Sequence, residues 1–436
     1  MRTSILMSLG AALGCGSPTQ PPAHDAPDQA GPLVSSSHAA SARVASFAHS
    51  DDATFLENAA IDLAQRCLLV DTHIDVPMRL DKSRDANGHV TEDVTSYTQK
   101  GDFDWPRARK GGLDAAFMSI YIPSKYELTG GGKQLADRLI DAVEEVVRRA
   151  PDKFARASSP GEVRANFAAG KISLPLGMEN GTPLSHDLAN LEHFHRRGIR
   201  YITLVHAKDN HIADSSFDTK HTHGGLSEFG RDVIMEMNRL GIMIDVSHAS
   251  DQAFWQILAL SRTPVIASHS SCRHFTPGWE RNMSDEMIVA LAERGGVVHI
   301  SFGSSFIDDE VRKIRDHQHK ELQAQMAMRG LEWGTPESFT FADEWERGQP
   351  SKFASVEQVA DHFDHVVRLV GVEHVGFGSD FDGVGDSLPE GLKDVSAYPN
   401  LIRSLLVRGY RESDIHKICG ENLLRVWQVI EDAASR

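Results

Sequence analysis

LLVDTHIDVP, residues 68–77, is an apolar strand that ends in two polar side chains, His73 and Asp75. Residues two apart in a strand point to the same side, so this imidazole and this carboxylate can meet one object. Both groups are ligands for transition-metal ions. The stretch therefore predicts a strand whose end faces a metal ion.

Seven further apolar runs rich in Val and Ile follow along the chain, separated by segments such as residues 132–150 that repeat apolar residues at i, i+3 and i+4. The eight runs are residues 67–73, 115–123, 172–180, 200–206, 241–248, 263–270, 295–302 and 373–383. Continuous apolar strands alternating with helices indicate a parallel sheet covered on both faces. Eight of them predict an α/β fold, a (β/α)8 TIM-type barrel.

Polar residues follow a regular pattern in these runs, because they fall at the carboxyl end. Six of the eight runs end in this way, at His73 with Asp75, Glu179, His206, His248, His269 and Asp380. In a (β/α)8 barrel that face carries the active site. An open doubly wound sheet would also gather ligands there, but it normally has a Gly-rich phosphate loop after its first strand, and the sequence has neither GxGxxG nor GxxxxGK[ST].

The overall charge restricts the class of partner. The 436 residues are 41% hydrophobic and 24% charged, which suits a globular chain with a sizeable core. The formal net charge is −16. An acidic chain offers no electrostatic footprint for nucleic acid or for an anionic membrane surface, so we expect neither as a partner.

The N-terminus has the composition of an export signal. Residues 1–15 contain Arg2, a short apolar run and small residues before Cys15, and the last of them resemble the lipobox of bacterial lipoproteins. Residues 16–50 form a Pro/Ser/Ala-rich tether, and residues 51–436 a single catalytic domain. We expect an exported protein of the bacterial cell envelope, in the periplasm or at the outer membrane, lipid-anchored at Cys15. An ordinary signal peptide cleaved nearby is the alternative.

The candidate ligands exceed what one tetrahedral zinc ion needs. Three histidines and at least two carboxylates converge on one barrel mouth, and a bridging carboxylate would let two ions sit roughly 3.5 Å apart. The remaining cysteines, Cys67, Cys272 and Cys419, are widely spaced without a CxxC, so thiolate ligands are not indicated. The pattern predicts a dinuclear hydrolase with zinc, two per chain, for which manganese or cobalt could substitute.

Several motifs, in order along the chain, resemble one family. They are DTHIDVP (71–77), GMENGTPL (177–184), YITLVHAKDNHIADSS (201–216), GLSEFGRDVIMEMNRLGIMIDVSHAS (225–250), PVIASHSSCR (264–273), ERNMSD (280–285) and HVGFGSDFDGV (374–384). Together they resemble the membrane (renal) dipeptidases, zinc dipeptidases of peptidase family M19 with the barrel of the metal-dependent amidohydrolases. The resemblance runs from about Leu68 to Glu431 and implies a dinuclear zinc dipeptidase whose small substrates include dipeptides with a C-terminal D-residue. It leaves a homodimer open.

The resemblance also implies a division of the metal ligands. His73 and Asp75 bind one zinc ion, His248 and His269 bind the other, and Glu179 bridges the two. Some related barrels use a carbamylated lysine as the bridge, but no lysine stands at a strand end in this sequence.

Three further residues receive roles from the resemblance. His206 contacts the substrate and helps to stabilise the tetrahedral intermediate. Arg281 holds the substrate carboxylate, which suits a guanidinium fork. Asp380 takes a proton from the attacking water and passes it to the leaving amine. From the residues alone Asp382, two positions further on, could face the same site, and only the family pattern favours Asp380.

Other features remain outside this predicted site. Five histidines near the mouth or in loops are interpreted as solvated or packed: His211, His221, His223, His274 and His299. The loop with Arg273 and Trp279 and the charged segment 306–350 are expected to wall the substrate pocket.

Two rival functions stay open. One is another metal-dependent amidohydrolase acting on a lactone, cyclic amide or phosphoester, which Asp75 in place of the usual second histidine of HxH disfavours. The other is a non-catalytic binding lipoprotein, which the presence of Glu179, Asp380 and the ligand histidines disfavours.

Overall fold

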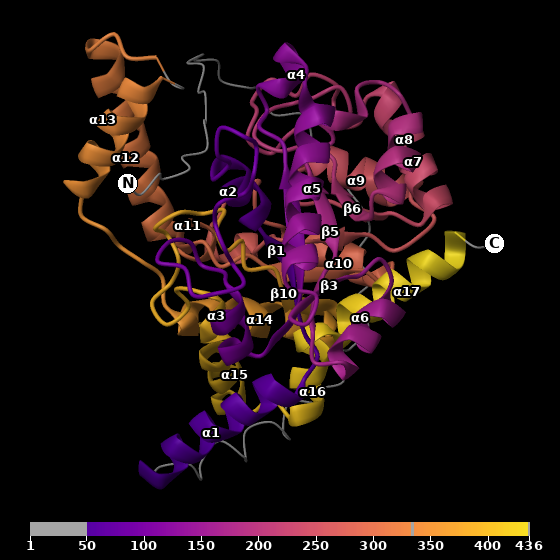
Figure 1. Ribbon diagram of the computed structural model, residues 1–436, viewed down its shortest axis with the longest axis vertical. Coiled ribbons are helices and arrows are strands. Elements are labelled where there is room, and N and C mark those ends of the chain that lie inside the picture. The colour runs from indigo at the N-terminus through magenta and orange to yellow at the C-terminus, as the bar shows by residue number, and fades with distance from the viewer. Residues whose placement is uncertain (1–49, 333–334, 435–436) are drawn as a thin grey trace, which may run out of the picture.

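The computed structural model describes residues 50–332 and 335–434 (Figure 1). The predicted export signal with Cys15 lies outside the described residues, as does the predicted tether up to residue 49. Within the described chain no helix has both the length and the apolar character to cross a membrane.

Eight parallel strands form a closed barrel. They are β1 (Leu69–Ile74), β2 (Leu113–Tyr121), β5 (Leu176–Glu179), β6 (Ile199–Thr203), β7 (Met243–Asp245), β8 (Ile266–Ala267), β9 (Val297–Ile300) and β10 (Val375–Phe377). Each pairs in parallel with the next, and β1 pairs with both β2 and β10, which closes the ring. Each of the eight predicted runs overlaps one of these strands, so the predicted (β/α)8 barrel is confirmed.

The third predicted run is divided. It holds β4 (Ile172–Leu174) as well as β5, and Pro175 between them has no N–H to donate. The Pro175 carbonyl still accepts a hydrogen bond from the backbone N–H of Met118. β4 pairs with β2 on one side and with the short β3 (Phe154–Arg156) on the other, outside the barrel.

Helices surround the strands (Figure 1). They are α1 (Ser50–Arg66), α2 (Val76–Lys82), α3 (Trp105–Gly111), α4 (Tyr126–Thr129), α5 (Gly132–Arg149), α6 (Pro160–Ala168), α7 (Ala189–Arg196), α8 (Glu228–Leu240), α9 (Asp251–Leu260), α10 (Asp285–Glu293), α11 (Ser304–Ile307), α12 (Asp309–Met328), α13 (Pro336–Arg347), α14 (Val356–Val370), α15 (Tyr398–Val407), α16 (Glu412–His416) and α17 (Asn422–Ala434). Short turns of other helical types are η1 (Thr182–Leu184), η2 (Arg273–Phe275), η3 (Val372–His374), η4 (Val395–Ala397) and η5 (Lys417–Glu421).

Serine caps start the helices that follow the barrel strands β6, β7 and β8. The hydroxyls of Ser227, Ser250 and Ser284 accept hydrogen bonds from the third backbone N–H of α8, α9 and α10. Such a cap satisfies a donor that the helix itself leaves unpaired. The cap of α9 stands only two residues after His248, so the chain between strand and helix is short and firmly placed.

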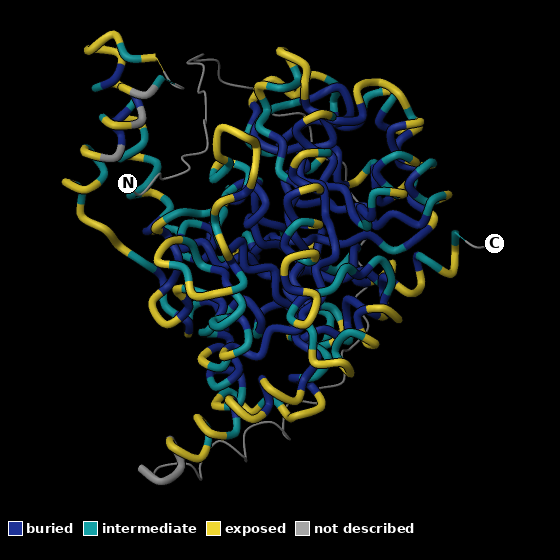
Figure 2. Tube along the Cα trace, in the orientation of Figure 1, coloured by how far each residue is buried: buried dark blue, intermediate teal, exposed yellow. Residues whose placement is uncertain are grey.

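The amino end of the barrel is closed by apolar packing. α17 lays Trp427 against Phe117 of β2, with ring centroids 5.3 Å apart. The same cluster contains residues from the starts of several strands, among them Val70, Met243, Ile266 and Val297. Figure 2 shows this buried core in dark blue at the centre of the molecule. The amino end is therefore a packed core.

Most of the described part of the charged segment 306–350 is helical, although a pocket-forming loop was expected from the sequence. α12 and α13 form a hairpin that projects from the barrel (Figure 1). Leu322, Met326 and Ala342 give it a small core of its own. The start of the segment lies near a residue of the predicted site, since the Arg281 guanidinium sits 5.1 Å above the Phe306 ring.

Candidate metal centre

The predicted site residues lie at the carboxyl end of the barrel, mostly just beyond the strands. His73 is within β1 and Glu179 is the last residue of β5. The others follow their strands by one to three residues: Asp75, His206, His248, His269 and Asp380. His248 and Asp380 adopt left-handed backbone conformations, each with φ of 66°. Non-glycine residues rarely do so, and such strain is typical of active sites.

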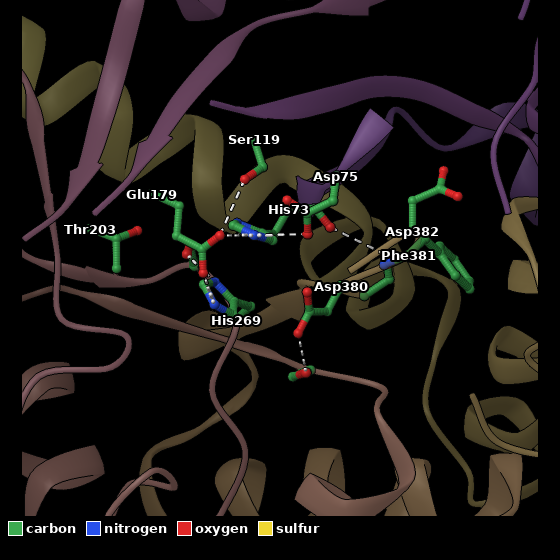
Figure 3. A network of polar contacts seen from close by, with 12 residues as sticks. His73, Asp75, Ser119, Glu179, Thr203, His269, Asp380, Phe381 and Asp382 are labelled. Atoms are coloured by element: carbon green, nitrogen blue, oxygen red, sulfur yellow. Dashed lines mark hydrogen bonds and ion pairs between the residues drawn. The ribbon is translucent and has the colours of Figure 1, made fainter. Parts of the chain in front are cut away.

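Glu179 is the centre of the group, and four imidazoles surround its carboxylate. Its Oε1 lies 3.2 Å from Nε2 of His248, 3.4 Å from Nε2 of His206 and 3.4 Å from Nε2 of His269. Its Oε2 lies 3.5 Å from Nε2 of His73. Figure 3 shows the carboxylate between His73 and His269. The structure thus brings four imidazoles, from β1 and from the segments after β6, β7 and β8, around one carboxylate at the end of β5.

Hydrogen bonds behind two of the histidines fix which ring nitrogen is free. The Tyr201 hydroxyl donates to the carbonyl of Thr72, so it accepts from Nδ1–H of His73, 2.8 Å away. The Ser268 hydroxyl donates to Asp245, so it accepts from Nδ1–H of His269, 2.7 Å away. With the proton on Nδ1, the Nε2 lone pair of each ring points into the site, as a metal ligand requires.

The donor set fits divalent metal ions. Several buried polar atoms in this group have no hydrogen-bond partner among the described residues: Nε2 of His73, Oδ1 of Asp75, both ring nitrogens of His206 and Nδ1 of His248. Orphaned buried donors and acceptors are costly, and metal coordination would satisfy Nε2 of His73 and Oδ1 of Asp75. Imidazole and carboxylate without thiolate suit zinc.

Three groups of potential ligands overlap at the mouth. Within each, one ligand atom per residue lies within 4.8 Å of the others. The groups are His73–Glu179–His269, Glu179–His206–His248 and His73–Asp75–Asp380. Two of them share Glu179, which suits a bridging carboxylate. His206 and Asp380, to which the sequence analysis gave substrate and proton roles, therefore lie within the same shell of donor atoms as the predicted ligands.

The electrostatics of the site keep His248 and His269 neutral and Glu179 ionised, but they favour the charged form of His73. Burial lowers the pKa of His73, whereas Tyr201 and the Asp75 and Glu179 carboxylates raise it well above the usual value. Burial lowers the pKa of His248 well below its usual range, and the Arg281 cation lowers it further. Burial and the neighbouring His73 lower the pKa of His269 to about 3. Burial opposes ionisation of Glu179, but His206 and His73 hold its pKa well below the usual value. A metal ligand must be a neutral imidazole or an ionised carboxylate, so metal binding would release the proton from His73.

Asp380 and Asp382 have different surroundings. Asp380 lines the pocket and accepts a long hydrogen bond, 3.5 Å, from the Ser301 hydroxyl. Burial raises its pKa to about 8. Asp382 points away from the group (Figure 3) and binds Arg79 at 2.6 Å. Its Oδ1 also accepts from the backbone N–H of Asp102 at 2.8 Å. This arrangement supports Asp380 as the proton carrier and gives Asp382 a structural role.

Arg281 reaches the group from the loop after β8. It is 2% exposed, and its Nη2 lies 3.1 Å from Nε2 of His248. The same nitrogen donates to the carbonyl of His269 at 2.7 Å, and Nη1 donates to the Ser270 hydroxyl at 2.9 Å. Its Nε–H has no partner among the described residues, so the guanidinium keeps a donor free for a ligand.

A pocket opens onto these groups. Its walls are Asp75, Met78, Tyr121, Glu179, His206, Asp380 and Gly383. A Cβ on Gly383 would lie 2.3 Å from Oδ1 of Asp380 and 2.3 Å from Oδ2 of Asp75. Any side chain larger than hydrogen at this position would displace one of the two carboxylates.

Three of the five histidines that the sequence analysis set aside have structural partners. His299 Nδ1 donates to the carbonyl of Ala267, and His223 Nε2 to that of Asn210. His211 binds Glu127 through Nδ1 at 2.9 Å. None of the three lies in a group of potential ligands within the described chain.

The residues behind the ligands were not predicted from the sequence. Tyr201, Asp245 and Ser268 orient the two histidines described above. Asp71 lies in the apolar run of β1, where its Oδ1 accepts from the backbone N–H of His73 at 2.9 Å. A carboxylate inside an apolar strand is costly unless it is paired, so Asp71 and Asp245 were visible signals of a polar network.

Comparisons with known proteins agree with this geometry. The family model for membrane dipeptidase (peptidase family M19) matches residues 57–436. Dipeptidase aclJ of Aspergillus oryzae is 34% identical over 341 residues, covering 77% of this chain and 71% of its own length. Dipeptidase tcpJ of Claviceps purpurea is 33% identical over 346 residues, covering 77% of this chain and 71% of its own.

Solved structures give the same result. The probable dipeptidase PvdM of Pseudomonas aeruginosa has a TM-score of 0.74 at 28% identity, covering 87% of this chain and 100% of its own. A metallopeptidase of Rhodobacter sphaeroides, bound to a phosphinate mimic of the dipeptide L-Ala-D-Ala, has a TM-score of 0.67 at 26% identity, covering 83% of this chain and 99% of its own. The chain therefore belongs to the membrane dipeptidases, the metallo-dipeptidases of peptidase family M19.

Proposed function

We propose that the protein hydrolyses the peptide bond of dipeptides with two zinc ions per chain. The observation that carries this proposal is the Glu179 carboxylate among four Nε2 atoms at 3.2 to 3.5 Å. His73, Asp75 and Glu179 would hold one ion, and Glu179, His248 and His269 the other. When bound, zinc lowers the pKa of a water molecule and polarises a carbonyl group.

Asp380 handles the proton in this proposal. Asp380 is a buried carboxyl group that lines the pocket beside Asp75, where it can act as a general acid and base. Its Oδ1 faces Asp75 across Gly383 and so lies at the pocket wall. Oδ1 takes a proton from the attacking water and gives it to the amine that leaves.

Arg281 and His206 bind the substrate. The free Nε–H of Arg281 is a buried donor for the carboxylate of a dipeptide. Both ring nitrogens of His206 are without partners among the described residues, so one of them can donate to the oxygen of the scissile carbonyl. A peptide with a distant carboxylate cannot reach Arg281 and the ligand group together.

The substrate range includes dipeptides with a C-terminal D-residue. The support is the relative from Rhodobacter sphaeroides, 26% identical, whose structure contains a phosphinate mimic of L-Ala-D-Ala. A comparison of L-Ala-D-Ala with L-Ala-L-Ala as substrates tests this part. Turnover of the L,L compound alone would contradict it.

A kinetic comparison tests the proposed function. The wild type should hydrolyse a free dipeptide faster than the matching dipeptide amide or a tripeptide. Arg281→Ala should weaken use of the free dipeptide by roughly 2 to 5 kcal/mol in transition-state binding. Arg281→Lys, which keeps the charge but loses the fork, should lie between the two.

Two results would contradict the proposal. The first is equal hydrolysis of all three substrates by the wild type, with no change in Arg281→Ala. The second is full activity after removal of the metal by a chelator, since the residues alone supply no activated water.

We also propose export and lipid anchoring at Cys15, supported by the signal-like residues 1–15 and the tether-like residues 16–50. Mass spectrometry of the mature N-terminus from a bacterial host should find a diacylglyceryl group on Cys15. An unmodified mature N-terminus elsewhere would refute anchoring.

A further inference from the structure

A second group of metal-binding side chains lies outside the candidate metal centre. It consists of His274 in η2, Asp285 at the start of α10 and His365 in α14. One ligand atom of each residue lies within 4.8 Å of the other two. Nε2 of His365 is 2.7 Å from Oδ1 of Asp285. These three residues, from three separate elements, are called the 274–285–365 group below.

The two imidazoles of this group resemble a pair in the candidate metal centre. The rings of His274 and His365 are stacked with centroids 4.3 Å apart and an angle of 22° between planes. At the mouth, His73 and His269 are stacked at 3.8 Å and 29°. In both places a carboxylate oxygen lies close to the Nε2 of one stacked ring, which is an arrangement suited to a shared cation.

The exposure of the group allows an ion to enter from solvent. His274 is exposed, Asp285 is partly exposed and His365 is 7% exposed. His274 contacts other rings but makes no hydrogen bond through its ring nitrogens among the described residues. The neighbouring His362 is different, because Nδ1 accepts from the backbone N–H of Cys272 and Nε2 donates to the carbonyl of Ile307.

We propose that the 274–285–365 group is a further divalent-metal site that takes zinc. Two imidazoles and one carboxylate are the ligand set of open zinc sites, in which water fills the remaining position. On binding, the ion replaces the hydrogen bond between His365 and Asp285. This site is separate from the proposed function, because none of its residues lies in the candidate metal centre.

An ion bound to the 274–285–365 group would restrain the neighbouring segment 274–285. His274 and Asp285 stand at the two ends of the segment 274–285 that carries Arg281. The ends of this segment are already joined by the backbone bond from Arg273 N–H to the Met283 carbonyl. An ion on the 274–285–365 group would fasten both ends to α14 and hold the Arg281 segment in place.

Zinc binding at equilibrium tests the proposal. The wild type, His274→Ala and Asp285→Asn are dialysed against the same series of buffered free zinc concentrations, and bound zinc per chain is measured by plasma emission. His317→Ala is the matched control, because His317 is 74% exposed on α12 and pairs with Glu321. The wild type and His317→Ala should bind one zinc ion more than His274→Ala and Asp285→Asn.

Hydrogen exchange provides a second readout. Zinc should slow exchange of the backbone amides of residues 274–285 more in the wild type and in His317→Ala than in His274→Ala. Equal zinc content in the wild type and His274→Ala overturns the proposal, and so does equal loss of one ion in His317→Ala. Failure of the candidate metal centre would lower the zinc content of all four proteins alike, so the difference between them still decides the question.

Discussion

The same eight strands form both ends of the barrel, but the two ends differ in polarity and in backbone strain. At the carboxyl end, buried polar atoms such as Nε2 of His73 have no hydrogen-bond partner in the part of the chain that the structure describes, and His248 and Asp380 hold left-handed backbone conformations. At the amino end, Trp427 and Phe117 pack in an apolar cluster without such strain. Unpaired polar groups and strain cost stability, whereas apolar burial supplies it. The amino end stabilises a fold whose carboxyl end is arranged for chemistry.

This contrast predicts that substitutions at the two ends affect different measurements. The largest effect is expected for Glu179→Ala, which removes the carboxylate that four imidazoles share. Turnover of a dipeptide should fall by more than the roughly 10² to 10⁴-fold that loss of one acid–base group costs. Bound zinc should fall as well. Steady-state kinetics and metal analysis of the purified variant measure both effects.

The control for Glu179→Ala is Glu412→Ala. Glu412 is an exposed glutamate that pairs with Arg66, away from the candidate metal centre. This variant should keep both turnover and zinc. A Glu179→Ala protein with near-normal turnover would falsify the bridging role and remove the proposed difference between the two ends.

At the amino end, Trp427→Ala should change stability and leave catalysis intact. Trp427 is 1% exposed, and removal of a buried aromatic side chain costs about 3 to 5 kcal/mol of unfolding free energy. Chemical denaturation measures this loss. Val429→Ala, on the exposed side of the same helix, should cost much less. A fall in kcat of the folded Trp427→Ala protein would show that the two ends are coupled.

The contrast also shows which parts of the molecule the sequence could predict. The eight runs predicted the barrel, because apolar strands and their spacing are local properties of the chain. Histidines and acids at the ends of those runs predicted the mouth, because parallel strands bring their carboxyl ends together. The helical hairpin at 306–350 was wrongly predicted as a pocket loop, because its high charge hid the few apolar residues, such as Leu322 and Met326, that form its core.

Other features depend on three-dimensional contacts that no pattern reveals. The sequence could not separate Asp380 from Asp382, because their difference arises from Arg79 and Asp102, more than 250 positions earlier in the chain. The role of Tyr201 depends on Gly177, where a Cβ would lie 1.9 Å from the tyrosine ring. Such contacts between residues that are distant in the sequence can be identified only from the three-dimensional arrangement of the strands.

His299 provides a test of how far the polar region at the carboxyl end extends into the barrel. It lies within β9, and burial lowers its pKa to about 4. In the unfolded chain the pKa of His299 is about 6.5. As the pH falls below this value, the unfolded chain therefore takes up a proton before the folded chain does. The stability due to neutral His299 is fully present above pH 6.5 and is lost as pH falls to about 4, by roughly 3 kcal/mol.

The measurement for His299 is a difference between two proteins. Unfolding free energies of the wild type and His299→Gln are compared from pH 7 to pH 4, so that other titrating groups cancel. The wild type should lose about 3 kcal/mol more than the variant over this range. If the unfolding free energies of the two proteins change with pH in parallel, His299 behaves like a solvated histidine in the folded protein. The packed region of the barrel would then not extend as far as His299.

The smallest effect is expected for Tyr201→Phe. Tyr201 acts on the candidate metal centre through its hydrogen bond with His73. Loss of the hydroxyl leaves Nδ1 of His73 without its acceptor, so the ring no longer has a fixed tautomer. Zinc affinity should fall about 10 to 100-fold, as for other partners behind metal ligands, while the fold is retained. Tyr410→Phe removes a hydroxyl that donates to Asp364, far from the mouth, and should leave zinc affinity unchanged. Competition with a chromophoric chelator measures both variants. If Tyr201→Phe binds zinc as tightly as the wild type, the metal ligands alone determine zinc affinity. The hydrogen bonds behind them would then have a structural role.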